Sequence, residues 1–229
     1  MASFIFIGIL TAIGVGLISS TSNNQRLWIG NLNPKKKKIE ADFQKMKLLL
    51  EPKVKTLIPW TSDETNLLSL EQIDFKKKKR GVIVTQGTFT SIYHEPMFAY
   101  TYKKYINKKH EDAIIYARTS NRAFEYRIKK DEVSIKINNK SIGTLKANGI
   151  LYRKNRLLAR INRNNSSSPI LLHTQKGHMK ELGQVTTERQ KDDIHPRALQ
   201  LVDQQMNNNE EAIFLALVLF EMIYHAVKR

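Results

Sequence analysis

The chain has 229 residues, with 38 lysines and arginines against 21 acidic residues and a formal charge of +17. This length suffices for one ordinary domain with an appendage and excludes two large domains. A composition of 41% hydrophobic and 26% charged residues supports a sizeable core and argues against wholesale disorder. The charge favours anionic partners, namely lipid head groups, nucleic acid or acidic proteins.

An uncharged apolar segment opens the chain. Residues 4–18 read FIFIGILTAIGVGLI, and no charge occurs between Met1 and Arg26. With its small polar flanks this segment spans roughly 18 residues, the lower limit for a helix that crosses a hydrocarbon core. We predict a membrane anchor over residues 1–20, with a cleaved signal peptide or a buried soluble helix as alternatives. Because lysines at 35–38 follow closely, the positive-inside bias predicts a single-pass protein with its amino terminus outside and the bulk of the chain in the cytoplasm.

Residues 21–80 have the composition of a basic connector with short helices. Apolar residues at helical spacing predict a helix over residues 39–50. The sequence TSDE at residues 61–64 is typical of a second helix start. A second basic run at residues 76–80 closes the connector.

From residue 81 to the end, the pattern predicts a β-domain. Segments rich in β-branched and aromatic residues recur at 82–84, 98–105, 113–117, 124–128, 133–137, 142–145, 150–152, 157–161, 170–173, 182–185 and 199–202. Asn138 and Asn139 suit a hairpin turn. About ten short strands at this spacing predict an antiparallel sandwich or closed barrel, and the lack of intervening helices excludes a parallel α/β sheet.

The last element is predicted to be a buried helix over about residues 210–227. It contains AIFLALVLF at residues 212–220 and is apolar on nearly all sides, so it lies either in lipid or inside protein. Its short length and the carboxylate of Glu221 favour a core helix over a second anchor. An asparagine among residues 207–209 is available as the N-cap.

At this point the chain resembles a known architecture. The matching segments are the strand-rich region 124–185, including SIGTL at 141–145 and LLARI at 157–161, and NEEAIFLAL at 209–217. They resemble the tubby carboxy-terminal-like group, which includes the plant LURP-one-related proteins and the phospholipid scramblases. The resemblance covers residues 81–229 and implies a closed β-barrel around a buried carboxy-terminal helix.

The departures from that group limit what the resemblance implies. Scramblases carry a cysteine-rich acylation segment, and this chain has no cysteine. Their membrane helix is commonly carboxy-terminal, whereas the predicted anchor here comes first. No functional residue is therefore carried over. The predicted fold is mainly β, an antiparallel closed barrel or sandwich around a buried C-terminal helix, with an N-terminal transmembrane helix in addition.

Motifs for catalysis, phosphate-loop binding or dinucleotide binding are absent from the sequence. His173 and His178 fit a surface pair across a turn better than a metal site. His94 and its neighbour Glu95 fit a loop between strands better than an acid–base couple. Glu221 and His225 share a helix face and are predicted to form a structural hydrogen-bonded pair. We therefore expect a non-enzymatic protein with no catalytic, cofactor or metal site and no small-molecule substrate.

The basic runs are the predicted functional residues. We expect them to contact anionic lipid head groups or a membrane-bound partner, at about 1 kcal/mol per lysine near an anionic leaflet. The predicted lipid-binding residues are Lys35, Lys36, Lys37, Lys38, Lys76, Lys77, Lys78, Lys79 and Arg80.

Four alternatives to lipid binding stay open. One is an enzyme with an unrecognised site, which a deep polar pocket in the barrel would favour. The basic runs fit simple solubility charge as well. A structural subunit or assembly factor of a larger membrane complex would use the same charge against acidic protein neighbours. A nucleic-acid-binding module would use the interleaved Arg118, Arg122, Tyr126 and Arg127 as a stacking surface.

Overall fold

The computed structural model describes residues 34–79, 81–106, 110–163, 167–174, 177–188 and 196–228. The chain separates into two compact units, residues 1–45 and 46–229, and each is described by itself. The predicted anchor at residues 1–20 lies outside the described residues. Within the described ranges, no helix has both the length and the apolar character needed to cross a bilayer.

Helix α2 (Pro34–Val54) confirms the helix predicted over residues 39–50 and begins earlier. Proline suits a first helical position, because its missing N–H would have no partner inside the helix. The helix α3 (Ser62–Thr65) is a single turn at the predicted second start. The backbone N–H of Thr61 donates to Glu64 Oε2 at 3.1 Å, which satisfies one of the open donors at this helix start.

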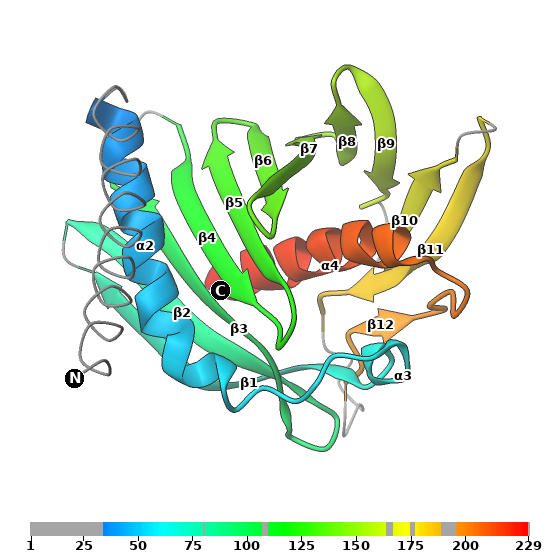
Figure 1. The fold of residues 1–229 in the computed structure, drawn as a ribbon, viewed down its shortest axis with the longest axis horizontal. Coiled ribbons are helices and arrows are strands. Elements are labelled where there is room, and N and C mark those ends of the chain that lie inside the picture. The colour runs from blue at the N-terminus through cyan, green and yellow to red at the C-terminus, as the bar shows by residue number, and fades with distance from the viewer. Residues whose placement is uncertain are drawn as a thin grey trace, which may run out of the picture. The chain divides into compact units, whose positions relative to one another are not determined.

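Twelve antiparallel strands form one sheet in which neighbours follow chain order, and this sheet curls into a nearly closed barrel (Figure 1). The barrel rather than the sandwich is therefore the observed form of the predicted β-domain. The strands are β1 (Leu68–Lys79), β2 (Val82–Ser91), β3 (Pro96–Tyr105), β4 (Asp112–Arg118), β5 (Ala123–Lys129), β6 (Glu132–Ile137), β7 (Lys140–Lys146), β8 (Ile150–Arg153), β9 (Arg156–Ile161), β10 (Ser167–His173), β11 (Met179–Thr186) and β12 (Leu199–Gln200).

The start of β1 meets the segment before β12, which closes the barrel at that point. Ser69 forms an isolated antiparallel bridge with Arg197. The N–H of Leu70 donates to the carbonyl of Pro196 at 3.0 Å, and the N–H of Ala198 donates to the carbonyl of Leu68 at 2.8 Å. Closure satisfies backbone groups that would otherwise lie on open sheet edges.

The first strand corrects the sequence interpretation. β1 begins at Leu68 and includes the lysines at 76–79, although the whole segment up to residue 80 was predicted as connector. A β-bulge between Ile73 and Lys76 breaks the alternation of apolar and polar residues that marks a strand. The hairpin turn is confirmed, since Asn138 and Asn139 have φ values of 46° and 65°. β12 covers only two of the four residues predicted for it.

Helix α4 (Asn208–Lys228) crosses the inside of the barrel, as Figure 1 shows. Every residue from Phe214 to Ile223 is buried, which confirms the predicted core helix. The strands contribute inward-facing aromatic and aliphatic side chains to the same core, so the helix fills a space that strand side chains alone would otherwise have to fill. Gly183 allows β11 to approach α4 closely, because a Cβ there would lie 3.0 Å from the Phe214 ring.

The start of α4 has the predicted asparagine cap. Asn207 Oδ1 accepts hydrogen bonds from the backbone N–H groups of Asn209 and Glu210, each at 3.0 Å. The N–H of Asn207 in turn donates to Glu210 Oε2 at 3.2 Å. This reciprocal pairing satisfies donors at the helix start that have no partner within the helix.

Candidate functional site

The second half of β1 is shaped by its bulge. Asp74 lies in the bulge with a φ of 54°, a conformation that non-glycine residues seldom adopt. Lys53 Nζ, from the last turn of α2, lies 3.1 Å from Asp74 Oδ2 and holds this residue in place. Bulges bend a strand and redirect its side chains. Here Phe75 is the last residue of the bulge, and the lysine run begins directly after it at Lys76.

Large apolar side chains and lysines are exposed together on this part of β1. Ile73 is 42% and Phe75 46% exposed, and the next three side chains, of Lys76, Lys77 and Lys78, are also exposed. These three lysines form no ion pair within the described part of the chain. We call these five residues the β1 lysine edge. From Glu71 onward, β1 has a neighbouring strand among the described residues only on the β2 side.

Strand β3 adds cations near the end of the β1 lysine edge. Lys78 lies opposite Val84, and Val84 lies opposite Lys103 on the next strand. Lys103 Nζ lies 5.5 Å from the centre of the Tyr105 ring, a cation–π contact. The positive charge at this end of the sheet therefore comes from two strands.

The predicted lipid-binding residues fall into two groups. Lys76, Lys77, Lys78 and Lys79 lie together on β1, while Arg80 lies outside the described residues. The run at 35–38 lies in the first turn of α2, in the other compact unit. That turn contains no acidic residue, and cations at this end of a helix oppose its dipole.

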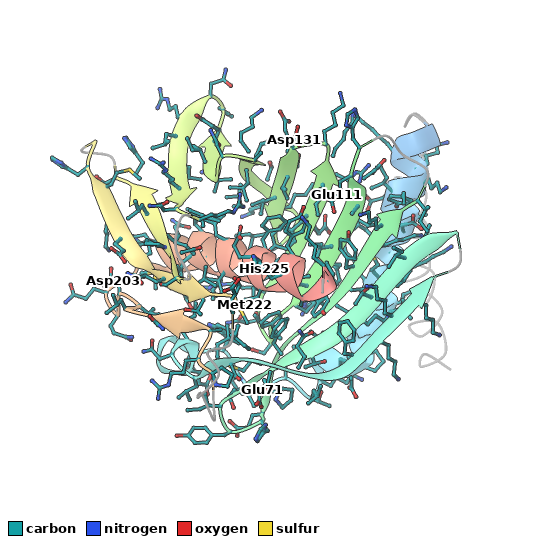
Figure 2. All side chains as sticks on the ribbon, turned by 180° about the vertical axis from the view of Figure 1, so that it is seen from behind. Glu71, Glu111, Asp131, Asp203, Met222 and His225 are labelled. Carbon is teal, nitrogen blue, oxygen red and sulfur yellow. The ribbon has the colours of Figure 1, made fainter. Side chains whose placement is uncertain are left out.

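A cavity of about 320 Å³ opens at the mouth of the barrel, where α4 ends. We call it the mouth cavity. Its apolar floor consists of Ile128, Val133, Leu145 and Phe220, and its polar rim includes Glu111, Lys130, Arg163, Glu221, Tyr224 and His225. Figure 2 labels Glu111 and Asp131 on the strand side and His225 on α4. The cavity was not predicted, because its residues come from three strands, four loops and one helix.

A buried carboxylate at the rim is held by an arginine. The Arg163 side chain donates to Glu221 from Nε at 3.2 and 3.3 Å and from Nη2 at 2.5 Å. Arg163 Nη1 also donates to the carbonyl of Ala147 at 2.9 Å. The Glu221 side chain is only 5% exposed, so an ionised form needs such a partner. The predicted helix-face pairing with His225 is thus replaced by a contact between α4 and the loop after β9.

The second rim carboxylate is held by tyrosines. Glu111 accepts hydrogen bonds from the hydroxyls of Tyr102 at 3.3 Å and Tyr224 at 2.6 Å, and Lys104 Nζ lies 3.9 Å away. Burial, and secondarily the Glu111 carboxylate, raises the pKa of both tyrosines, so the two hydroxyls stay protonated donors. Tyr224 is 113 residues from Glu111 along the chain, and at this separation the sequence gives no indication that the two side chains meet.

The residues of the other predicted sites have ordinary surroundings. His94 is an exposed hairpin side chain 3.1 Å from Glu71, as the loop interpretation predicts. No group of three or more metal-ligating side chains occurs within the described ranges. In the proposed stacking surface, Tyr126 is fully buried in the barrel and Arg122 pairs with Glu211 at 2.7 Å. Tyr126 is therefore not available to stack on a base.

Comparisons with protein-family profiles, with curated proteins and with solved structures return no match to this chain. The resemblance to the tubby carboxy-terminal-like group stays a prediction. The candidate sites are assigned from their own geometry and charge.

Proposed function

We propose that this protein contacts the head-group surface of anionic membranes through the β1 lysine edge. The observation that carries the proposal is the exposure of Ile73 and Phe75 directly beside Lys76, Lys77 and Lys78. Apolar side chains gain by entering the boundary between head groups and acyl chains, while lysines near an anionic leaflet contribute about 1 kcal/mol each. Solubility charge alone accounts for the lysines but not for the exposed Phe75.

The alternation of side chains along a strand determines how such a contact is made. Lys76 and Lys78 point to one face of the sheet and Lys77 to the other. All three can reach one plane only if the membrane meets the edge or tip of β1 rather than either face. Lysines on a sheet edge also oppose pairing with other chains, which fits an edge that binds lipid and not another strand.

The other basic run supports the same proposal. Cations in the first turn of α2 oppose the helix dipole, at a typical cost of about 0.3–1 kcal/mol each. Because these lysines destabilise the helix that contains them, binding to an anionic partner explains their presence better than a role in folding does. With the predicted anchor at residues 1–20, both runs would act on a tethered protein, with the barrel on the cytoplasmic side.

A second candidate is a subunit of a membrane protein complex. It is favoured by Leu48 and Leu49 on α2, which are 74% and 53% exposed. Adjacent exposed leucines on a helix are typical of a protein contact. A stoichiometric partner that co-purifies after mild detergent extraction would favour this candidate.

Vesicle flotation of residues 24–229 tests the lipid proposal, once circular dichroism and a cooperative thermal transition show that this fragment is folded. The variant K76E/K77E/K78E reverses the charge of the β1 lysine edge. The matched control K140E/R153E/R156E makes the same charge change at exposed positions on β7, β8 and β9, which are not neighbours of β1 in the sheet.

We expect the unmodified fragment to float with anionic but not neutral vesicles, and less so at physiological salt, because exposed charges are screened over about 8–10 Å. The lysine variant should bind at least tenfold more weakly, while the control should change less than threefold. Equal losses in both variants would show that only net charge matters and would overturn the assignment of the site.

A further inference from the structure

We infer that the mouth cavity binds a small amphiphilic anion, with a carboxylate or phosphate head and a short hydrocarbon part. This inference uses side chains outside the β1 lysine edge and does not rest on the proposed function. Its first support is the division of the cavity into an apolar floor and a polar rim. The floor residues Ile128, Val133, Leu145 and Phe220 offer hydrocarbon and aromatic surface to the tail of such a ligand.

Arg163 is positioned to receive the head group. A guanidinium has five N–H donors in a rigid fork. Those of Arg163 serve Glu221 and the carbonyl of Ala147, which leaves one N–H on Nη1 and one on Nη2 without a partner among the described residues. The side chain is 36% exposed, so these two donors can reach a ligand at the rim. Two donors of one guanidinium match the two oxygens of a carboxylate or phosphate.

The acids at the rim do not oppose an anion as strongly as their number suggests. Glu221 is neutralised by Arg163, and Glu111 is bound by two tyrosine hydroxyls with Lys104 beside it. Lys130 has an exposed side chain that makes no salt bridge within the described part of the chain. Arg163 and Lys130 can therefore still donate to a ligand. Of the three acids that line the cavity, Glu111 and Glu221 are already paired, and the third is Asp131.

The ion pair between Arg163 and the buried Glu221 itself supports a binding role. An ion pair that buries a carboxylate is seldom more stabilising than a well-packed apolar contact of the same size. The Arg163–Glu221 contact does, however, fix the guanidinium at the edge of the cavity before any ligand arrives. Such pre-organisation reduces the entropy that binding would otherwise lose. At about 320 Å³, the cavity is at the lower end of ligand-site sizes, which favours a short tail.

Isothermal titration of the full chain with octanoate tests the inference. Octan-1-ol, which has the tail without the charge, and acetate, which has the charge without the tail, are the paired control probes. We expect octanoate to bind and both control probes to bind at least tenfold more weakly. Octyl phosphate distinguishes the two head groups, since tighter binding than octanoate would assign a phosphate-bearing ligand and weaker binding a carboxylate.

Variants locate the site. Arg163→Lys keeps a charge beside Glu221 but removes the planar fork, and should weaken octanoate binding at least tenfold. Lys130→Glu alters an exposed side chain that makes no salt bridge within the described ranges, and should weaken binding at least threefold. Lys140→Glu, an exposed lysine at the opposite end of the barrel, should change it less than twofold.

Several results would overturn the inference. One is the absence of octanoate binding to the unmodified chain at millimolar concentration. Another is equal binding of octanoate and octan-1-ol, which would assign a purely apolar cavity. The third is unchanged octanoate affinity in folded Lys130→Glu protein, which would place binding elsewhere even if Arg163→Lys failed to fold.

Discussion

At the scale of single residues, two polar contacts along its fully buried part join α4 to the barrel around it. The Tyr126 hydroxyl, fully buried, donates to the carbonyl of Ala216 at 2.8 Å, and burial raises the pKa of Tyr126 well above its ordinary value. Arg163 pairs with Glu221 near the other end of the buried part of the helix. Apolar packing inside a barrel is compatible with many helix positions, whereas these contacts select one depth and rotation.

Replacing Arg163 should destabilise the fold more than replacing Glu221. Arg163→Met leaves a 5% exposed carboxylate without its partner, which typically costs about 3–5 kcal/mol. Glu221→Leu leaves a 36% exposed guanidinium that can turn toward water, so the loss should be smaller. The double variant should recover most of the stability. Urea denaturation measures all three, and equal losses in both single variants would contradict this account.

Tyr126→Phe should lower the free energy of unfolding by about 0.5–1.5 kcal/mol, the usual net value of one hydrogen bond. The loss is moderate because the Ala216 carbonyl lies inside a helix and still has its helical donor. Tyr93→Phe, at a 67% exposed position, is the matched control and should change stability by less than about 0.5 kcal/mol. A loss no larger than the control's would show that the buried hydroxyl does not contribute.

At the scale of elements, the start of α4 is held by an ion-pair cluster. Lys180 on β11 lies 2.8 Å from Asp203 and 3.0 Å from Glu210. The hydrogen bond from Lys180 lowers the pKa of Asp203 below its ordinary value. The hydrogen bonds to Asp203 and Glu210 raise the pKa of Lys180. The cluster therefore connects β11 to the segment that leads into the helix.

The cluster predicts a pH-dependent contribution. The pKa of Asp203 is lower in the folded chain than in the unfolded chain, where it is about 3.9. Ionised Asp203 therefore stabilises the fold fully above about pH 3.9, and this stabilisation is lost as the pH falls through the pKa of the folded chain. Lys180→Met should cost less than about 1 kcal/mol at pH 7, since the pair is partly exposed. The difference from the unmodified protein should shrink between pH 5 and pH 3. A constant difference across that range in urea denaturation would contradict this assignment.

The junction between β7 and β8 depends on a glycine. Only Thr144 with Tyr152 and Leu145 with Leu151 pair across it. A Cβ at Gly143 would lie 2.2 Å from the backbone carbonyl oxygen of Tyr152, which cannot move without displacing β8. Gly143→Ala should therefore destabilise the fold by about 1–3 kcal/mol or more in urea denaturation. Ser141→Ala, at an exposed position of the same strand, is the control, and similar losses would contradict the steric explanation.

The elements differ in how far the sequence predicted them. Strands such as β5 and β6 alternate apolar with polar residues along the sequence, and the asparagine cap of α4 is a local signal, so both were predictable. β1 was not, because its bulge shifts the alternation and its lysines are typical of a connector. The mouth cavity was not predictable either. Its contacts join residues 58 and 113 positions apart, which only the closed barrel brings together.

At the scale of the whole molecule, we propose that the β1 lysine edge meets an anionic bilayer. The absence of cysteine permits a direct test, since a single introduced thiol is labelled uniquely. The 46% exposed Phe75 is suited to carry the label, and the 67% exposed Tyr93, on the hairpin between β2 and β3 beyond the far end of β1, is a matched control position.

The decisive measurement is NBD fluorescence of Phe75→Cys and Tyr93→Cys fragments (residues 24–229) mixed with anionic vesicles that contain doxyl-labelled lipid. We expect the label at position 75 to brighten on binding and to be quenched by the doxyl lipid, and both effects to weaken with salt. The label at position 93 should not respond. A label at position 75 that stays in water while the protein is vesicle-bound, or equal responses at both positions, would contradict the proposal.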